Sequence, residues 1–319
     1  MSPSVSIIIP AFNAQEFIGR AIASALAQQR VTIEVLVIDD SSYDNTASLV
    51  QDICKQDSRV RLLKTTGNSG PGAARNIGIE CASHDWVAFL DVDDWMAPDR
   101  LHTLLETAHN NQLDFVADSY YLSSRPGIAP HGRKYCRLSD VNELSRYDLA
   151  SFIRVGLGSI RAVIRRRFLT RTNVRFSTEI WRGEDTLFYA QLLLQQARFA
   201  LLNTPMYFRS EPGHSLSRSD KQALFKDLLL VYAMLRKSIV GNAPEHLHTV
   251  DAIFYRIKVV NDALAAARWQ SFIAGFPFIE SPEVSSLMGL VRHVLLRHKR
   301  YQMQLTSRIR RQLSSQFPH

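Results

Sequence analysis

The chain has 319 residues, of which 46% are hydrophobic and 21% are charged, so it can bury the core of one large or two modest domains, and extensive disorder is excluded. Its net charge of +8 does not indicate a nucleic-acid partner, because seven basic residues follow Glu283 and the residues before them carry 31 basic against 30 acidic side chains. No run approaches the roughly 18 apolar residues of a membrane span, and no secretory leader is visible. Three scattered cysteines suit a reducing compartment, so we expect a cytoplasmic protein.

Short apolar runs alternate with segments of helical periodicity from residue 4 to about residue 118. This order predicts an α/β fold in which crossover helices join the strands of a mainly parallel sheet. Strands are expected at residues 5–10, 33–38, 60–64 and 86–90. The last run is apolar throughout, as a strand covered on both faces should be, which predicts a central place in the sheet.

Helix starts are marked in two of the intervening segments. Asn13 is expected to cap a helix, because Glu16 follows three residues later as in a capping box. Pro71 suits the first turn of a helix that runs to about residue 82.

Beyond residue 118 the pattern weakens and then returns. A helix is expected after Gly183 and a short strand at residues 199–202. From about residue 221 onward, apolar residues recur at helical spacing over 224–239 and 250–267. We therefore predict an α/β domain over residues 1–220 and a helical extension over residues 221–319.

Three carboxylates, Asp91, Asp93 and Asp94, follow the predicted central strand. Open α/β sheets bind ligands at the carboxyl ends of their strands, and two unit charges about 4 Å apart repel by about 4 kcal/mol at an effective dielectric near 20. A divalent cation that prefers oxygen ligands, Mg²⁺ or Mn²⁺, would offset this repulsion. In the alternative interpretation, one aspartate caps the next helix and the others face water.

Two further features lie at the ends of predicted strands. Asp39 and Asp40 end the second strand, where they could hydrogen-bond a nucleoside or serve as turn residues. The glycine-rich turn at residues 67–72 could bring N–H groups to a phosphate, but its spacing differs from the GxGxxG of nicotinamide-binding proteins. Arg75, one turn further on, either contacts a phosphate or holds the acidic loops in place.

Five motifs in this order resemble the inverting glycosyltransferases of family 2, which have the GT-A fold. The motifs are SIIIPAFNAQEFI, VLVIDDSSYDNT, GNSGPGAARNIGI, FLDVDDW and RGEDTLF, and the resemblance covers about residues 4–217. It implies a mainly parallel mixed sheet flanked by helices. It also implies transfer of a sugar from a nucleoside diphosphate sugar.

The resemblance further implies roles for the residues that match these motifs. Pro10, Phe12 and Asn13 match the residues that line the base and the ribose of the donor. Asp40 matches the carboxylate that recognises uracil, and Arg75 matches the basic residue after the glycine turn. A UDP-linked donor is therefore expected.

The acidic cluster matches the DxD motif of the family. Asp91 and Asp93 match its ribose and metal contacts, and we favour Asp93 as the metal ligand, with Asp94 as the alternative. Further along the chain, Arg209 could neutralise phosphate and His214 could complete the metal shell, although a lone histidine is more often a surface or packed residue. A bound Mg²⁺ or Mn²⁺ would stabilise the charge of a diphosphate leaving group.

Inversion by direct displacement requires a base that takes the proton of the acceptor hydroxyl. Glu184 and Asp185 match the ED motif of the family, in which one carboxylate has that role. We expect Asp185 to be the base and Glu184 to position the acceptor or share the role. Alternatively, both residues only favour the start of a helix electrostatically.

Two basic segments are compatible with either binding or solvation. The run of Arg161, Arg165, Arg166 and Arg167 could meet an anionic acceptor or form a solvated face. Residues 284–319 carry apolar stripes at helical spacing among seven basic side chains. This pattern is typical of an interfacial helix on anionic lipid, which would place the protein at the inner face of the plasma membrane, or of a solvated face of the extension.

We therefore predict a metal-dependent enzyme that moves a UDP-linked sugar to a hydroxyl of a glycan or lipid-linked oligosaccharide in polysaccharide synthesis. Two alternatives remain. A sugar nucleotidyltransferase would normally carry a glycine-rich, basic loop after the first strand, and PAFNAQE contains neither glycine nor a basic residue. A non-catalytic nucleotide- or glycan-binding module would bind the donor without turnover.

Overall fold

The computed structural model describes residues 3–265, apart from residues 124–128, 131, 136–142 and 211–220. Its strands form one mixed sheet in the order β3-β2-β1-β4-β9-β6-β10-β5, with β7 paired to β6 and β8 paired to β10. The strands are β1 (Ser4–Ala11), β2 (Thr32–Asp39), β3 (Val60–Lys64), β4 (Trp86–Phe89), β5 (Trp95–Met96), β6 (Phe115–Ser123), β7 (Gly132–Lys134), β8 (Leu144–Arg146), β9 (Val163–Arg165) and β10 (Phe199–Ser210).

The amino-terminal part of the sheet is parallel, as the sequence predicts. β1 pairs in parallel with β2 and β4, and β2 pairs in parallel with β3. β4 lies between β1 and β9 and is buried along its whole length, which confirms the central position expected for this strand. Because parallel neighbours end at the same edge, the segments that follow β1, β2 and β4 gather there.

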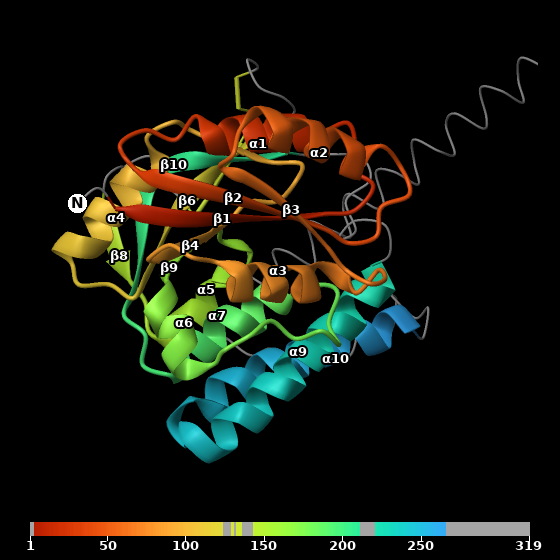
Figure 1. Ribbon diagram of the computed structural model, residues 1–319. Coiled ribbons are helices and arrows are strands. Elements are labelled where there is room, and N and C mark those ends of the chain that lie inside the picture. The colour runs from red at the N-terminus through yellow and green to blue at the C-terminus, as the bar shows by residue number, and fades with distance from the viewer. Residues whose placement is uncertain (1–2, 124–128, 131, 136–142, 211–220, 266–319) are drawn as a thin grey trace, which may run out of the picture. The chain divides into compact units, whose positions relative to one another are not determined.

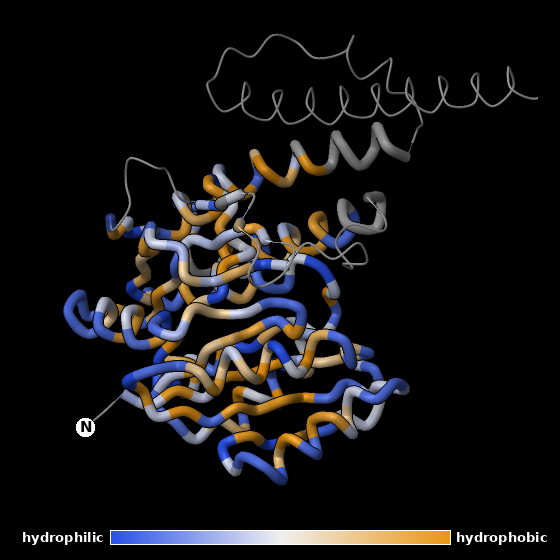
Figure 2. The backbone as a smooth tube through the Cα atoms, turned by 90° about the horizontal axis from the view of Figure 1, so that it is seen from above, coloured by the Kyte–Doolittle hydropathy of each residue, from blue (hydrophilic) through white to orange (hydrophobic). Residues whose placement is uncertain are grey.

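Helices cover both faces of this sheet. They are α1 (Ile18–Leu26), α2 (Thr46–Gln56), α3 (Gly70–Cys81), α4 (Arg100–Asn110), α5 (Leu149–Val155), α6 (Arg166–Thr172), α7 (Glu184–Leu194), α9 (Lys221–Asn242) and α10 (Leu247–Ala265). α1 and α2 lie on one face, and α3, α5, α6 and α7 lie on the other (Figure 1). Figure 2 shows hydrophobic residues concentrated in the interior of the backbone path and hydrophilic residues along much of its periphery.

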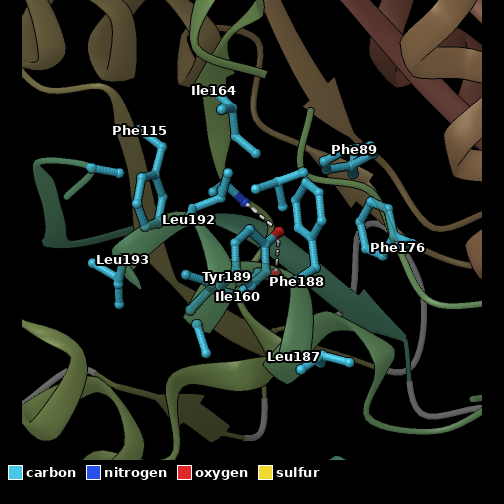
Figure 3. Close-up of a cluster of buried hydrophobic side chains, with 14 of the residues drawn as sticks. Phe89, Phe115, Ile160, Ile164, Phe176, Leu187, Phe188, Tyr189, Leu192 and Leu193 are labelled. Atoms are coloured by element: carbon cyan, nitrogen blue, oxygen red, sulfur yellow. Dashed lines mark hydrogen bonds between the residues drawn. The ribbon is translucent and has the colours of Figure 1, made fainter. Parts of the chain in front are cut away.

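Aromatic rings fill the core between the sheet and α7 (Figure 3). Phe115 stacks on Phe199 with 4.3 Å between the ring centroids, and Tyr189 lies beside them. The buried Tyr189 hydroxyl donates to the carbonyl of Ile160 at 3.2 Å and accepts from the amide of Ala162 at 3.3 Å. α7 therefore fixes the backbone on both sides of residue 161.

α9 and α10 belong to the same compact unit as the sheet. Val231, Leu235 and Ile239 of α9 are fully buried in the core cluster that includes α7. The domain boundary near residue 220 stays a prediction, and the basic segment 284–319 lies outside the described residues. Within the part of the chain that the structure describes, no helix combines the length and the apolar character of a membrane span.

Two local predictions differ from the structure. Asn13 does not cap a helix, because α1 begins at Ile18 and Asn13 has a φ of +48°. Its side chain instead accepts a hydrogen bond from the amide of Tyr43 at 3.1 Å, so bonding between two loops replaces helix capping. The strand expected at residues 199–202 continues to Ser210, because β10 remains paired with β6 beyond a register shift.

We predict that Gly78→Ala lowers the free energy of unfolding by about 1–3 kcal/mol, because an added methyl group overpacks the contact between α3 and β1. A Cβ atom at position 78 would lie 2.4 Å from Cγ2 of the fully buried Ile8. Gly19→Ala in α1 is the matched control, because nothing lies within 4 Å of its Cβ, and alanine should stabilise that helix by about 0.5–1 kcal/mol. Urea unfolding measures both changes, and equal effects would contradict the packing described for α3.

Candidate active site

Three aspartates form an acidic cluster in the turn after β4. One carboxylate oxygen from each of Asp91, Asp93 and Asp94 lies within 4.8 Å of the others. Asp94 is buried, and its carboxylate accepts hydrogen bonds from the Tyr207 hydroxyl at 2.7 Å and the Ser210 amide at 2.8 Å. Burial, followed by the charges of Asp93 and Asp91, raises the pKa of Asp94 well above its ordinary value.

Asp93 is the member of the cluster whose carboxylate is open to a ligand. Arg20 donates to its backbone carbonyl, and no described side chain donates to its carboxylate. Burial and the charge of Asp91 raise the pKa of Asp93. Clustered oxygen ligands with surplus negative charge suit Mg²⁺ or Mn²⁺, so the cluster fits a hard divalent cation.

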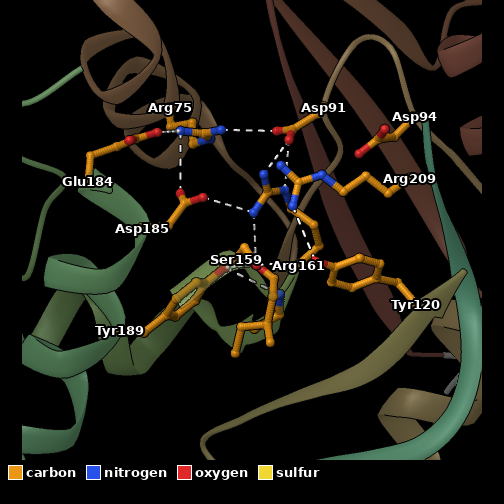
Figure 4. A network of polar contacts seen from close by, with 12 residues as sticks. Arg75, Asp91, Asp94, Tyr120, Ser159, Arg161, Glu184, Asp185, Tyr189 and Arg209 are labelled. Atoms are coloured by element: carbon orange, nitrogen blue, oxygen red, sulfur yellow. Dashed lines mark hydrogen bonds and ion pairs between the residues drawn. The ribbon is translucent and has the colours of Figure 1, made fainter. Parts of the chain in front are cut away.

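Two buried arginines join Asp91 to the start of α7 (Figure 4). Arg75 of α3 donates to Asp91 at 3.0 Å and to Glu184 at 2.7 Å. Arg161 donates from Nε to Asp91 at 2.9 Å and from Nη1 to Asp185 at 2.8 Å. Although burial opposes the shift, the charges of Arg161 and Arg75 lower the pKa of Asp91 well below its ordinary value. Two guanidinium groups thus hold three carboxylates in one network.

Gly183 allows α7 to begin with the two acidic residues expected to act in catalysis. Its φ of +86° lies in the left-handed region that favours glycine. Glu184 is 6% exposed. Burial and the charge of Asp185 raise its pKa to about 7, although the ion pair with Arg75 acts to lower that pKa. Asp185 directs Oδ2 to Arg161, whereas its Oδ1 lies 3.5 Å from Nη1 of Arg75. Oδ1 is therefore the less engaged of the two oxygens.

Arg161 is a site residue that the sequence analysis did not single out from its arginine-rich run. β9 runs antiparallel to β4, so Arg161, which precedes β9, lies at the acidic edge. Arg165, Arg166 and Arg167 follow at the opposite edge of the sheet. The sequence contains one feature that could have indicated such a cation. Carboxylates clustered at the end of a buried strand need positively charged partners, and these must come from elsewhere in the chain.

A fully buried ion pair anchors the backbone of Arg161. Arg100 of α4 has no exposed surface, donates to Asp118 of β6 at 2.8 Å, and also donates to the carbonyl of Arg161. Together with Tyr189, this pair fixes residue 161 from two sides. The core therefore determines where this guanidinium points.

Asp40 follows β2 and holds the glycine-rich turn. It is buried, and its carboxylate accepts hydrogen bonds from Oγ1 of Thr65 at 2.8 Å, the amide of Ser69 at 2.9 Å and the amide of Gly70 at 2.8 Å. These bonds explain why a carboxylate directly follows this strand. The contact of Asp40 with uracil stays a prediction.

The loop after β1 carries the other residues expected at the nucleoside. Pro10 belongs to β1, and Phe12, which is 41% exposed, packs edge-on against the exposed ring of Tyr43 with 5.9 Å between centroids. The amide of Asn13 donates to Oγ of Ser42 at 2.9 Å. The loops after β1 and β2 thus present two aromatic rings to solvent beside each other.

Arg209 of β10 reaches toward the acidic cluster (Figure 4). Its guanidinium donates to the Tyr120 hydroxyl at 3.2 Å. His214 lies outside the described residues. The structure thus brings together the predicted residues Arg75, Asp91, Glu184, Asp185 and Arg209. The carboxylates of Asp93 and Asp94 lie next to this group, in the acidic cluster.

Comparison with known proteins assigns the family. The family model for glycosyl transferase family 2 matches residues 6–169, so the chain belongs to this family. The succinoglycan biosynthesis protein ExoO of Rhizobium meliloti (strain 1021) is 35% identical over 224 residues, which are 68% of this chain and 63% of ExoO. ExoU of the same organism, also named a succinoglycan biosynthesis protein, is 32% identical over 249 residues, which are 75% of this chain and 70% of ExoU. The chain thus spans less than two thirds of ExoO.

A solved structure supports the fold. The crystal structure of residues 1–349 of TarS from S. aureus in complex with UDP-GlcNAc is 21% identical, with a TM-score of 0.63, over 88% of this chain and 78% of that chain. At this identity the likeness concerns the fold, and it confirms the expected GT-A architecture of a mostly parallel sheet flanked by helices.

We predict that Arg161→Gln lowers the free energy of unfolding by about 3–5 kcal/mol, because Asp91 and Asp185 lose a buried partner. Urea unfolding at neutral pH measures the loss. Arg30→Gln removes the same charge from an exposed position and should change stability by less than about 0.5 kcal/mol. A loss at Arg161 as small as that at Arg30 would contradict the network.

The raised pKa of Glu184 predicts a pH dependence of stability. Its folded pKa of about 7 exceeds its ordinary value of 4.5, so the folded protein binds more protons than the unfolded chain between these values. The free energy of unfolding should therefore fall as the pH rises from about 4.5 to about 7. Glu184→Gln should flatten this part of the curve, measured by urea unfolding at stepped pH. The conservative change Glu80→Gln on α3 should leave it unchanged.

Proposed function

We propose that the chain is an inverting, metal-dependent glycosyltransferase that moves a sugar from a UDP-linked donor to a hydroxyl of a glycan or lipid-linked glycan. The observation that carries this proposal is the network in which Arg161 joins Asp185 to Asp91. In this network the proposed base lies close to the acidic cluster, which fits a divalent cation. Displacement of a diphosphate by a hydroxyl needs both features.

The donor nucleotide is proposed to bind across the ends of β1, β2 and β4. The exposed rings of Phe12 and Tyr43 offer apolar faces to a nucleobase. Pro10, near the end of β1, and Asn13, in the loop after it, flank Phe12 in the chain. The TarS structure, which has the same fold, was determined with UDP-GlcNAc, and this supports uridine as the base.

Asp93 is the proposed ligand of Mg²⁺ or Mn²⁺. Its carboxylate has no side-chain donor in the described part of the chain, whereas Asp94 already accepts from Tyr207 and Ser210. When bound, the ion supplies positive charge to the departing diphosphate. Arg209, whose side chain points toward Asp91 in Figure 4, would add a guanidinium to the diphosphate site.

Asp185 is proposed to act as the base. Arg161 fixes its direction through Oδ2, which leaves Oδ1 to accept the proton of the acceptor hydroxyl. The deprotonated oxygen attacks the anomeric carbon from the face opposite the diphosphate, the new glycosidic bond forms, and the bond to the diphosphate breaks. Glu184, held by Arg75, would position the acceptor.

The acceptor is proposed to be a growing glycan, free or lipid-linked. The names of ExoO and ExoU, which place those proteins in succinoglycan biosynthesis, support a role in polysaccharide synthesis. The seven basic residues of 284–319 would hold the enzyme at an anionic membrane surface inside the cell. Salt-sensitive binding to anionic vesicles, lost when this segment is removed, is the corresponding measurement.

Asp185→Asn should lower the rate of sugar transfer by about 10²–10⁴-fold, because the amide cannot accept the proton. Donor affinity should persist, because the donor contacts lie on other residues. Release of nucleoside diphosphate from a mixture of nucleotide sugars with Mn²⁺ measures the rate, and calorimetry measures the affinity.

Asp52→Asn, an exposed aspartate of α2, is the matched control and should retain full transfer. Undiminished transfer by Asp185→Asn would remove that residue as the base. Donor binding by the unaltered chain without release of nucleoside diphosphate, whichever acceptor is supplied, would instead identify a binding module.

A further inference from the structure

A positively charged cavity lies at the edge of the sheet opposite the acidic cluster. Its volume is about 610 Å³, and it is lined at the start of β4 and at α6. Its lining comprises Asp85, Trp86, Thr170 and four arginines, which are Arg165, Arg166, Arg167 and Arg171. We call it the arginine cavity. It shares no residue with the candidate active site.

Two of its arginines are held in place by the fold. The guanidinium of Arg165 stacks over the ring of Trp86, 4.4 Å from its centroid, and donates from Nε to the carbonyl of Leu113 at 2.9 Å. Arg166 donates from Nε to the carbonyl of His84 at 2.6 Å. Both guanidinium groups are therefore oriented through Nε, and within the described residues no acceptor takes their Nη hydrogens.

The positive charge of the arginine cavity is not balanced. Within the described part of the chain, none of its four arginines forms an ion pair. Asp85, its one carboxylate, is exposed and accepts only from the hydroxyl of Ser4, at 3.3 Å. Burial, and then the charge of Arg167, lowers the pKa of Arg165, as expected where like charges gather. The charge of Asp114 also acts on Arg165, but Asp114 is already paired with Arg198 at 3.1 Å. Four arginines therefore line the cavity with one carboxylate, Asp85.

These features select a class of ligand. Guanidinium forks bind the oxygens of phosphate in pairs, and a stacked, preoriented arginine loses little freedom when it does so. Cavities of about 300–1,000 Å³ hold small molecules or head groups. Neutral sugars would leave the four charges unpaired. An anion with two or more negative charges would balance them.

We propose that the arginine cavity is a second binding site, which takes a phosphate-bearing anion with at least two negative charges. The ligand is either a soluble phosphate compound or the head group of an anionic lipid. Arg165 and Arg166 form the fixed part of the site. Arg167 and Arg171, which are exposed, complete it from α6.

Calorimetry with inorganic pyrophosphate tests the soluble ligand. The full chain is titrated at low ionic strength with EDTA, so that no divalent cation can recruit pyrophosphate to the acidic cluster. Arg167→Gln/Arg171→Gln should weaken binding at least tenfold. Both side chains are exposed and lie outside the donor and acceptor residues, so the melting temperature should change little.

Two further variants separate a site from general charge attraction. Arg30→Gln/Arg59→Gln removes two exposed arginines that precede β2 and β3, and it should bind pyrophosphate as the unaltered chain does. Arg167→Lys/Arg171→Lys keeps the positive charges but removes the bidentate guanidinium groups. This variant should lose part of the pyrophosphate affinity that the glutamine variant loses. An equal loss in the Arg30/Arg59 variant would overturn the proposal.

Sedimentation with vesicles that contain cardiolipin, whose head group bears two phosphates, tests the lipid source. Because every variant retains residues 284–319, the contribution of that segment cancels in the comparison. Weaker vesicle binding by the Arg167/Arg171 variant alone, without pyrophosphate binding by any variant, assigns the site to a lipid head group. Pyrophosphate binding that depends on these two arginines assigns it to a soluble phosphate. If neither probe distinguishes this variant from the unaltered chain, the arginine cavity is a solvated surface and the proposal is wrong.

Discussion

Carboxylates that are buried together need cationic partners, because an unpaired buried charge is costly. This requirement determines which side chains meet at the carboxyl ends of the parallel strands. Asp91, Glu184 and Asp185 come from segments far apart in the chain, and Arg75 and Arg161 bring them together. Without either cation, like charges would face one another in surroundings that screen them poorly. The network forms only when α3, the turn after β4, the segment before β9 and α7 are all in place. Removing one partner is therefore costly, because it leaves a buried charge uncompensated, whereas the intact network mainly fixes the relative positions of these segments.

Local signals made much of the fold and part of the site predictable. The apolar run at residues 86–90 indicated a buried central strand, and parallel strands bring their carboxyl ends to one edge. The position of the acidic cluster followed from that rule alone. Gly183 followed by two acidic residues similarly marked the start of α7. In each case the relevant residues lie within a few positions of one another, so a short stretch of sequence contains the information.

Long-range pairings could not be predicted from the sequence. The run from Arg161 to Arg167 looks like one basic cluster, but the antiparallel strand β9 sends Arg161 to one edge of the sheet and the other arginines to the opposite edge. Nothing local indicates that residues 163–165 enter the sheet between β4 and β6. Tyr207 was missed for a similar reason, because its bond to Asp94 depends on how β10 passes the acidic turn.

The shortness of β9 restricts how this chain can change over evolutionary time. Val163 and Ile164 are both fully buried, one in each of the two core clusters on opposite sides of the sheet. Inserting one residue here would exchange the faces of these side chains and also shift Arg161 away from its carboxylates. Deleting one would do the same in the other direction. A change in the length of this segment would therefore disturb the core and the acidic network at once, whereas a substitution such as Ile164→Val would affect only the packing around one side chain.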